Sequence, residues 1–421
     1  MLNAILPVRS LLVAIFILMA GGGFLSTLIA LRLERAGHDT LVIGVVATAY
    51  FAGLVAGALR AGLVVRRVGH IRAFAAFVAL LSASTLAYAL IQHPLLWGML
   101  RLIDGFCVAG VFICLESWLN DRAEAATRGS ILAAYMVALY SGQALGQLLL
   151  SAGGSLPAVP FQIASILISL AIIPLCLTRS TAPAPPETAG ISVRGLLARA
   201  PLGVIGTVAT GLMLGAFYGL AAVQVRRMGL DLDATALFMM IVIMGGVALQ
   251  WPLGHLSDRY ERRRVIVWSF AATMVASLTL AFLPAPGLGL LLCGALFGGL
   301  SFALYPMCVA HSNDRLLPEE RVAASGGLVL LYSAGAVLGP MGAAIFMSLV
   351  QTGGVFLFMA LCAGGALGFG LWRQAAAAPV PGEDQQDFQI LVRTTPVAAL
   401  LDPHVPEDEA TDHPLTGLKE G

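Results

Sequence analysis

Two oppositely charged residues, Arg101 and Asp104, lie three positions apart inside an otherwise apolar run, residues 95–116. On a helix this spacing places both side chains on one face, where they can pair. A carboxyl group in apolar surroundings can also carry a proton, and protonation of Asp104 would free Arg101 to hold an anion. Two interpretations stay open: a structural ion pair, or a functional pair that exchanges protons.

A second group of charged residues occurs twice in the chain. The stretch "GLVVRRVGHIR" covers residues 62–72, and "GHLSDRYERRR" covers residues 254–264. Each has a glycine four positions before a charged residue, which is Arg66 in the first copy and Asp258 in the second. Keeping a loop on one side of a membrane is a sufficient explanation for Arg262, Arg263 and Arg264. The fixed offsets of the glycine and the acid favour a specific contact as well.

The composition shows where these residues must be held. The 421-residue chain is 58% hydrophobic and 11% charged, whereas a soluble domain is about 25% charged. A membrane-crossing helix needs about 20 apolar residues. We therefore predict an all-α polytopic membrane protein with an uncleaved first helix and twelve transmembrane runs, at residues 8–31, 41–65, 72–91, 95–116, 129–152, 159–177, 199–223, 234–256, 264–283, 288–311, 324–350 and 353–373.

The arginines predict the orientation of these helices. Sixteen of them lie in the ends and loops of one side, and four lie in the loops of the other side. Basic residues mark the cytoplasmic side of a membrane protein. Both termini are therefore expected in the cytoplasm, for a multi-pass protein of the inner (plasma) membrane.

The residue content excludes several activities. Lys419 is the only lysine, so the phosphate-binding motif G-x-x-x-x-G-K-[ST] of ATP-hydrolysing proteins is absent. No H-E-x-x-H and no close Cys/His spacing occurs, so we expect no metal and no cofactor, and we interpret the six cysteines as small buried residues. The net charge of +1 gives no sign of a nucleic-acid partner. We expect a monomer in the lipid bilayer, and not an enzyme.

The chain contains an internal repeat with an offset of 192 to 193 residues. "RAGHD" (35–39) matches "RMGLD" (227–231), "NDR" (120–122) matches "NDR" (313–315), and "SGQALG" (141–146) matches "AGAVLG" (334–339). We predict a six-helix bundle over 1–177, a flexible or extended linker over 178–198, a second bundle over 199–373 and an acidic, mostly disordered tail over 374–421. The apolar interruption "DFQILVRTTPVAALLDP" in this tail could dock on the basic face, or it could be a short recognition peptide.

These motifs together resemble the major facilitator superfamily of secondary transporters. The basic loops resemble its loop signature between the second and third helices, and "RLIDGFCVA" (101–109) resembles its R-x-x-x-G-x-x-x-A motif. "YFAGLVAG", "LAAYM", "LGQLL", "QWPLG" and "LYPM" resemble the YcaD-like branch. The resemblance implies two parallel six-helix halves that rock around a central site, with the proton gradient as the energy source.

The resemblance also implies roles for individual residues. A gating role falls on Gly62, Arg66, Arg67, Gly69, Arg72, Glu116, Arg128, Gly254, Asp258, Arg259, Arg263, Asp314 and Arg321, and a helix-packing role on Gly105, Ala109, Gly142, Gly146, Gly335, Gly339 and Pro340. Asp258 is expected to contact the N-terminal end of the eleventh helix and the loop arginines to pair with Asp314 and Glu319, latching the cytoplasmic side. Arg66 cannot make such a contact, and we expect it to seek Glu116, Asp121 or lipid phosphate. Asp258→Asn should therefore impair transport more than Arg66→Ala.

Glu116 has two open interpretations: a proton or substrate carboxylate, or a structural ion-pair partner of Arg67 or Arg128, which we favour. By the resemblance, the first, fourth, seventh and tenth helices line the cavity, so the candidates for proton or substrate contacts are Asp104, Arg101, Cys107, Ser26, Thr27, Tyr218, Ser301 and Tyr305. Few charges among them favour a small, moderately hydrophobic or weakly charged solute. We expect a proton-coupled transporter, with efflux favoured. An uncoupled facilitator and a transporter-like receptor remain the alternatives.

Overall fold

The computed structural model describes residues 6–152, 156–177, 193–283, 287–350, 352–376, 385, 388–389 and 393–401. Every regular element within these residues is a helix. Twelve spans are long and apolar enough to cross a membrane, which confirms the predicted all-α, twelve-helix architecture. Most of the predicted linker, residues 178–192, lies outside the described residues. Its last part is helical, because α10 covers Val193–Arg199.

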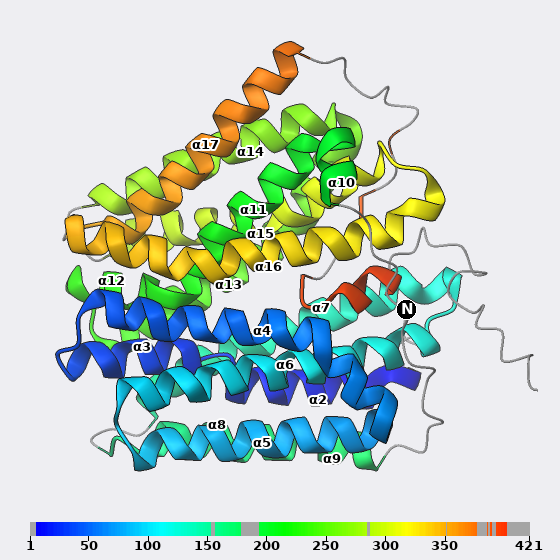
Figure 1. Cartoon of the computed structure of the whole chain (residues 1–421). Helices are drawn as coiled ribbons and strands as arrows, with labels where there is room; N and C mark the ends of the chain where they lie inside the picture. The colour runs from blue at the N-terminus through cyan, green and yellow to red at the C-terminus, as the bar shows by residue number, and fades with distance from the viewer. Residues whose placement is uncertain are drawn as a thin grey trace, which may run out of the picture.

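The elements follow the chain in two sets of six spans (Figure 1). The first set consists of η1 (Leu6–Val8), α2 (Arg9–Gly22), α3 (Leu25–Arg35), α4 (Thr40–Val68), α5 (His70–Leu90), α6 (Pro94–Arg122), α7 (Ala125–Gln147), η2 (Leu148–Ser151), α8 (Val159–Leu170) and α9 (Ile173–Cys176). The second consists of α11 (Pro201–Ala216), η3 (Phe217–Ala221), α12 (Ala222–Arg227), α13 (Leu232–Arg259), α14 (Arg262–Phe282), α15 (Leu288–Asn313), α16 (Pro318–Leu349) and α17 (Gly354–Ala376).

Glycines pack the helices of each half in the same way. A methyl group on Gly142 or Gly146 of α7 would collide with the backbone of α2, at Phe16 and Ala20. At the repeat-related positions, Gly335 and Gly339 of α16 lie against the backbone of α11, at Val208 and Leu212. Small residues allow membrane helices to approach this closely. The predicted helix-packing motif therefore lies where the helices touch.

The contact between α4 and α6 also depends on small residues. A side chain on Gly105 would collide with the carbonyl oxygen of Tyr50, and Ala109 lies against Gly57. The repeat-related crossing of α13 with α15 places Gly298 against the carbonyl oxygen of Val242. Pro340 contacts a different element, since it lies beside Gly219 of η3 and close to Gly44 of α4. This proline is therefore at the boundary between the halves.

The first span of each half is interrupted at an equivalent depth. The first span changes from α2 to α3 around Gly23 and Phe24, and the seventh span contains the π-helical turn η3, which starts at Phe217. Phe24 and Phe217 differ by 193 positions, the offset of the repeat. π-Helical turns and broken membrane helices are frequent at functional sites. Neither interruption was expected from the sequence.

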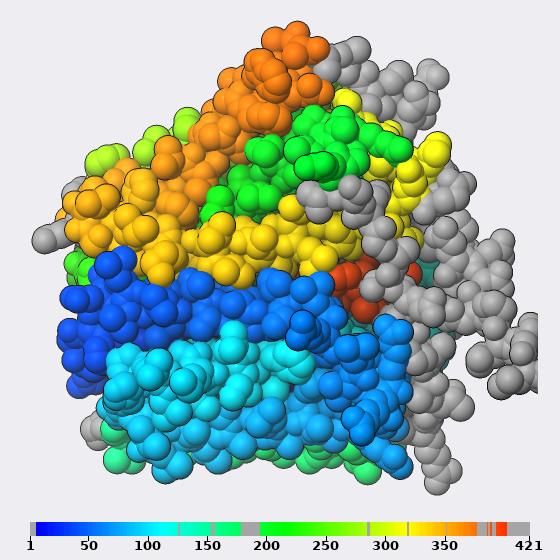
Figure 2. All heavy atoms as spheres, in the orientation of Figure 1, coloured from blue at the N-terminus to red at the C-terminus, as the bar shows by residue number. Residues whose placement is uncertain are grey.

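The two ends of the bundle differ in how the halves meet. We call the end with the α4–α5 and α13–α14 connections the basic end, and the other the opposite end. Toward the opposite end, Arg227 Nε lies 2.7 Å from Glu34 Oε1, and Thr48 Oγ1 donates to the carbonyl of Val337 over 3.1 Å. At the basic end, a piece of the C-terminal tail lies between the halves (Figure 2).

This piece, which we call the tail segment, comprises the described residues 388–389 and 393–401. Its helix η5 (Pro396–Leu401) packs against α6 and α7 of the first half and α16 of the second. Val397, Ala398 and Leu401 of this helix are buried. The apolar interruption of the tail therefore docks at the basic end, one of the two roles expected for it, because its apolar side chains find apolar partners between the halves. Residues 402–421 lie outside the described residues.

Candidate functional site

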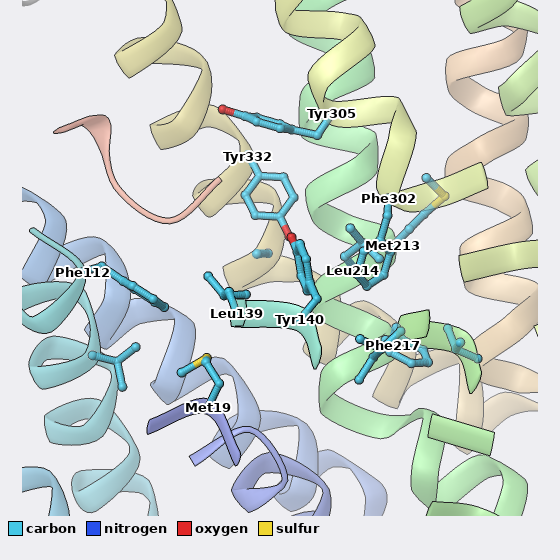
Figure 3. Close-up of a cluster of buried hydrophobic side chains, with 14 of the residues drawn as sticks. Met19, Phe112, Leu139, Tyr140, Met213, Leu214, Phe217, Phe302, Tyr305 and Tyr332 are labelled. Atoms are coloured by element: carbon cyan, nitrogen blue, oxygen red, sulfur yellow. The ribbon is translucent and has the colours of Figure 1, made fainter. Parts of the chain in front are cut away.

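A central cavity of about 140 Å³ lies between the two halves. Its lining comes from the first half, from the second half and from the tail segment, and includes Ser26, Arg101, Asp104, Tyr218, Tyr332 and Arg393. Figure 3 shows Met19, Phe112 and Leu139 of the first half facing Phe217 and Tyr332 of the second across this region. A pocket with apolar walls and a few convergent polar groups is the usual form of a small-molecule site.

The Arg101–Asp104 pair lies in the wall of this cavity. Both residues are buried, with side-chain exposures of 4% and 1%, and their nearest charged atoms are 3.7 Å apart. The predicted ion pair is therefore confirmed. The Asp104 carboxylate also accepts hydrogen bonds from Tyr88 Oη, over 2.6 Å, and from Ser84 Oγ. The sequence analysis had not named either hydroxyl group, because both come from α5, which is distant in sequence.

Arg101 has partners besides Asp104. Its guanidinium donates to Ser26 Oγ, on α3, and its Cζ lies 4.0 Å from the centre of the Tyr50 ring, on α4. A cation over an aromatic face at this distance is stabilised by about 2 kcal/mol when it is shielded from water. Arg101 can therefore keep its place whether or not Asp104 carries a charge.

The other predicted cavity residues divide into two groups. Ser26 and Tyr218 line the cavity, and Tyr218 Oη lies 3.2 Å from Gln143 Oε1 of the first half. Thr27 and Cys107 are buried outside its lining, and Ser301 Oγ donates to the carbonyl of Phe297 in its own helix. Tyr305 packs edge to face on Tyr332, with ring centres 5.3 Å apart, and so supports the lining from behind.

The most prominent group in the cavity comes from the tail. Arg393 Cζ lies 4.4 Å from the ring centre of Phe302, 5.5 Å from that of Tyr332 and 5.6 Å from that of Tyr140. We call these three rings, from α15, α16 and α7, the aromatic cage (Figure 3). Sequence reasoning missed this site. The available signal was the apolar interruption with a single arginine in an otherwise acidic tail.

Glu116 lies beneath the tail segment and is fully buried. Its carboxylate accepts hydrogen bonds from the hydroxyl groups of Thr394 and Thr395, and Tyr135 Oη lies 3.2 Å away. The expected ion pair with Arg67 or Arg128 is absent from the part of the chain that the structure describes. The physical reason is geometric, since the tail segment occupies the space in front of the carboxylate.

The loop motif of the second half forms a compact ion cluster at the basic end. Arg262, 1% exposed, makes hydrogen bonds of 2.7 and 2.6 Å to both carboxylate oxygens of Asp314, and of 2.9 Å to Asp258. The predicted role of Asp314 as an arginine partner is confirmed. The partner is Arg262, however, which the sequence analysis had assigned only to topology. Arg259 is exposed, and Arg263 pairs with Glu261 over 2.8 Å.

Asp258 and Gly254 both contact the tail segment. Asp258 Oδ1 accepts a hydrogen bond of 2.8 Å from the backbone N–H of Phe388, and a methyl group on Gly254 would collide with the Phe388 ring. Among the described residues, Asp258 contacts the tail segment and Arg262, and the expected contact with the N-terminal end of α16 is not seen there. Arg321 is half-buried near that end. The side chain of Glu319 lies outside the described residues.

The loop motif of the first half has a different environment. Arg66, Arg67 and Arg72 are exposed, and they take part in no ion pair within the described ranges. The expected pairing of Arg66 with Glu116 or Asp121 is therefore not present. A methyl group on Gly62 would meet open space. Gly69 has φ +84°, a backbone conformation that favours glycine, and it turns the chain sharply from α4 into α5.

Three comparisons with known proteins agree. The family model of the Major Facilitator Superfamily matches residues 11–251 and 203–403. The chain is 31% identical, over 361 residues, to an uncharacterized MFS-type transporter YcaD of Salmonella enteritidis PT4, covering 84% of this chain and 92% of that protein. Its fold is similar to that of the nucleoside transporter NupG, with a TM-score of 0.71, 15% identity, and 88% and 98% of the two chains covered.

A second solved structure has the same fold. It is a bacterial homolog of the human lysosomal transporter Spinster in an inward-facing and occupied conformation, with a TM-score of 0.71 and 13% identity, and 91% of this chain and 98% of that chain are covered. At these identities the solved structures support the fold alone. The family match and the 31% identical relative carry the assignment. This twelve-helix chain belongs to the major facilitator superfamily, whose members are membrane transporters and not enzymes.

Proposed function

We propose that the protein is a proton-coupled secondary transporter of the inner membrane that exports a small, moderately hydrophobic or weakly charged solute. The observation that carries the proposal is the Arg101–Asp104 pair, buried in the wall of a cavity that both halves share. A charged pair at this depth in a membrane is costly and is found mainly where ions or substrates pass.

The hydrogen bonds of Asp104 support proton exchange at this residue. Ser84 Oγ donates to Asp104 but also lies 3.0 Å from the carbonyl oxygen of Leu81, in its own helix. When Asp104 takes up a proton, the Ser84 hydroxyl can turn to this carbonyl and accept from the new carboxylic acid. The carboxyl group therefore has hydrogen-bond partners in both protonation states, which limits the free-energy penalty of burying either state.

Protonation of Asp104 also changes the situation of Arg101. The ion pair is lost, but Ser26 and the Tyr50 ring still hold the guanidinium in the cavity wall. The positive charge then has no counter-charge in the pair, and binding of a cationic solute beside it becomes less favourable. Proton uptake and release of a cation from the cavity are thus coupled through one residue, as exchange of solute for protons requires.

The orientation expected from the arginines places the basic end in the cytoplasm. The contacts between Glu34 and Arg227 and between Thr48 and Val337 then close the outer side, and the cavity faces inward behind the tail segment. A solute entering from the cytoplasm would reach Asp104 from this side. Rocking of the halves about the cavity would next open the outer side.

The test uses purified protein in proteoliposomes. A thermal-shift screen against metabolites and drugs identifies a solute that binds the protein. The flux of this solute is then measured with and without a pH gradient. Asp104→Asn should abolish accumulation driven by the gradient, because the coupling carboxyl group is gone. Asp233→Asn, an exposed acid in the first turn of α13, is the matched control and should transport normally.

Three outcomes would contradict the proposal. Full gradient-driven accumulation by the Asp104→Asn protein would exclude Asp104 as the coupling group. Equal flux of the wild type with and without a gradient would indicate an uncoupled facilitator, and saturable binding without any flux would indicate a receptor.

A further inference from the structure

The guanidinium of Arg393 is held deep inside the bundle by aromatic faces. The aromatic cage of Tyr140, Phe302 and Tyr332 surrounds its Cζ at 4.4 to 5.6 Å. Phe302 and Tyr332 lie near the middle of α15 and α16, so the charge sits about halfway through the bundle. Among the described residues, no carboxylate forms an ion pair with Arg393.

This arrangement specifies the chemistry that the cage selects. The faces of aromatic rings carry partial negative charge and attract cations within about 6 Å. A planar, delocalised guanidinium is more weakly hydrated than a compact ammonium ion and stacks on rings, so it loses less on entering an apolar site. The ring faces of the cage carry no positive charge, so they favour a cation over an anion.

We propose that the aromatic cage is the binding site for the transported solute, that this solute is a planar organic cation of the guanidinium or amidinium class, and that Arg393 occupies the cage as an internal competitor. The inference rests on the proposed transport function, to which it adds the substrate class. The cavity of about 140 Å³ beside Arg393 is about as large as an engineered protein cavity that holds one benzene molecule. A larger solute therefore enters only when the tail segment leaves.

The contacts of the tail segment fit a competitor that can dissociate. Thr394 and Thr395 donate to Glu116, the backbone of Phe388 donates to Asp258, and the Phe388 ring covers Gly254. Each of these contacts joins the tail segment to one of the two halves. A tethered group of this kind acts at a high effective concentration without being permanently bound. Solute binding and tail docking then exclude each other at the cage.

The experiment measures binding of phenylguanidinium to the full-length protein in lipid nanodiscs by isothermal titration calorimetry. If the tail occupies the cage in about nine molecules of ten, its removal raises the apparent affinity about tenfold. Arg393→Ala should therefore bind the probe about tenfold more tightly than the wild type. Arg373→Ala is the matched control, because Arg373 also lies over an aromatic ring, that of Trp372, but at the end of α17. It should bind as the wild type does.

Two further binding measurements test the role of the aromatic cage and the role of the positive charge on the probe. Tyr332→Leu in the Arg393→Ala background should lose the gain in affinity, with its thermal unfolding midpoint recorded to show that it folds. Phenylurea, which has the shape of the probe without its charge, should bind the Arg393→Ala protein at least about tenfold more weakly than phenylguanidinium does. Equal affinities of wild type and Arg393→Ala for phenylguanidinium, or of Arg393→Ala for the two compounds, would overturn the proposal.

Binding is measured at equilibrium and without a pH gradient, so its outcome is independent of proton coupling. Tight, cage-dependent binding without gradient-driven flux would refute the proposed function and leave the cage assignment standing. Gradient-driven flux of another solute, with phenylguanidinium binding insensitive to Arg393 and Tyr332, would refute the cage assignment alone.

Discussion

The two copies of the basic loop have diverged into different structures. In the second half, Arg262 is buried between Asp314 and Asp258, and Asp258 also holds the tail segment. In the first half the position related to Arg262 is His70, which is buried beside the ring of Trp118 with centres 5.7 Å apart. The position related to Asp258 is Arg66, which is exposed. The two repeat-related loops therefore join their helices at equivalent positions, but the charged residues at these positions differ.

This difference shows why the tail docks on one copy only. A backbone N–H group needs an acceptor, and Asp258 supplies one where Arg66 could only donate. Gly254 is covered by Phe388, whereas Gly62 faces open space. The change from Arg66 to Asp258 thus gives the second copy an anchoring site for the tail segment, which the first copy lacks among the described residues.

The largest expected effect comes from breaking the buried ion cluster. Arg262→Ala leaves Asp314, 1% exposed, without its main counter-charge, and should lower the free energy of unfolding by about 3–5 kcal/mol. His70→Ala at the related position removes only packing, for about 1 kcal/mol. Thermal unfolding of both purified proteins checks the difference. The double variant Arg262→Ala/Asp314→Ala should recover part of the loss, and equal destabilisation by the two single variants would show that the copies are equivalent.

The second-largest expected effect is the loosening of the tail segment by a substitution at Gly254, which Phe388 covers. Gly254→Leu should expel the Phe388 ring, which removes apolar burial of about 1.5 kcal/mol or more and raises amide hydrogen exchange of residues 393–401 about tenfold. Gly62→Leu should leave this exchange unchanged, because a Cβ atom at Gly62 meets nothing within 4 Å. Hydrogen exchange read by mass spectrometry distinguishes the two. Unchanged hydrogen exchange of residues 393–401 in the Gly254→Leu protein would mean that Phe388 does not anchor the tail segment.

The smallest expected effect is that of a single charge. Asp258→Asn keeps an acceptor for the Phe388 N–H but weakens its hydrogen bonds by about 1 kcal/mol, so exchange of the tail segment should rise about fivefold. Arg66→Ala should have no effect on exchange. The same ranking is expected for the size of the change in solute flux, since Asp258 binds Arg262 and the tail segment whereas Arg66 is exposed. A larger effect of Arg66→Ala in either measurement would contradict the asymmetry between the copies.

Local patterns were sufficient for much of the architecture. The apolar runs predicted the twelve spans, and the repeat offset relates Gly142 with Gly335 and Gly146 with Gly339, which pack in equivalent positions. The spacing of Arg101 and Asp104 predicted their pairing. These features depend on contacts within one helix or between helices of one half. Their outcome follows from side-chain size, charge and the 3.6-residue period.

The misassigned residues share a different property. Glu116 was expected to pair with Arg67 or Arg128, and Asp258 to contact the N-terminal end of α16. Both contact the tail segment, as does Gly254. Arg262 was interpreted as a topology signal because it stands among three consecutive arginines. Which of these arginines is buried depends on the direction in which α14 starts, and the residue types alone carry no information on it.

The sequence by itself determined that this chain is a twelve-helix membrane protein of two related halves, because hydrophobic length, glycine spacing and arginine placement act locally. It also determined that Arg101 and Asp104 share a helix face. Only the tertiary structure decided that Arg393 lies among Tyr140, Phe302 and Tyr332. These four residues come from three helices and the tail, and their meeting depends on the separation of the halves at the basic end, which no local pattern encodes.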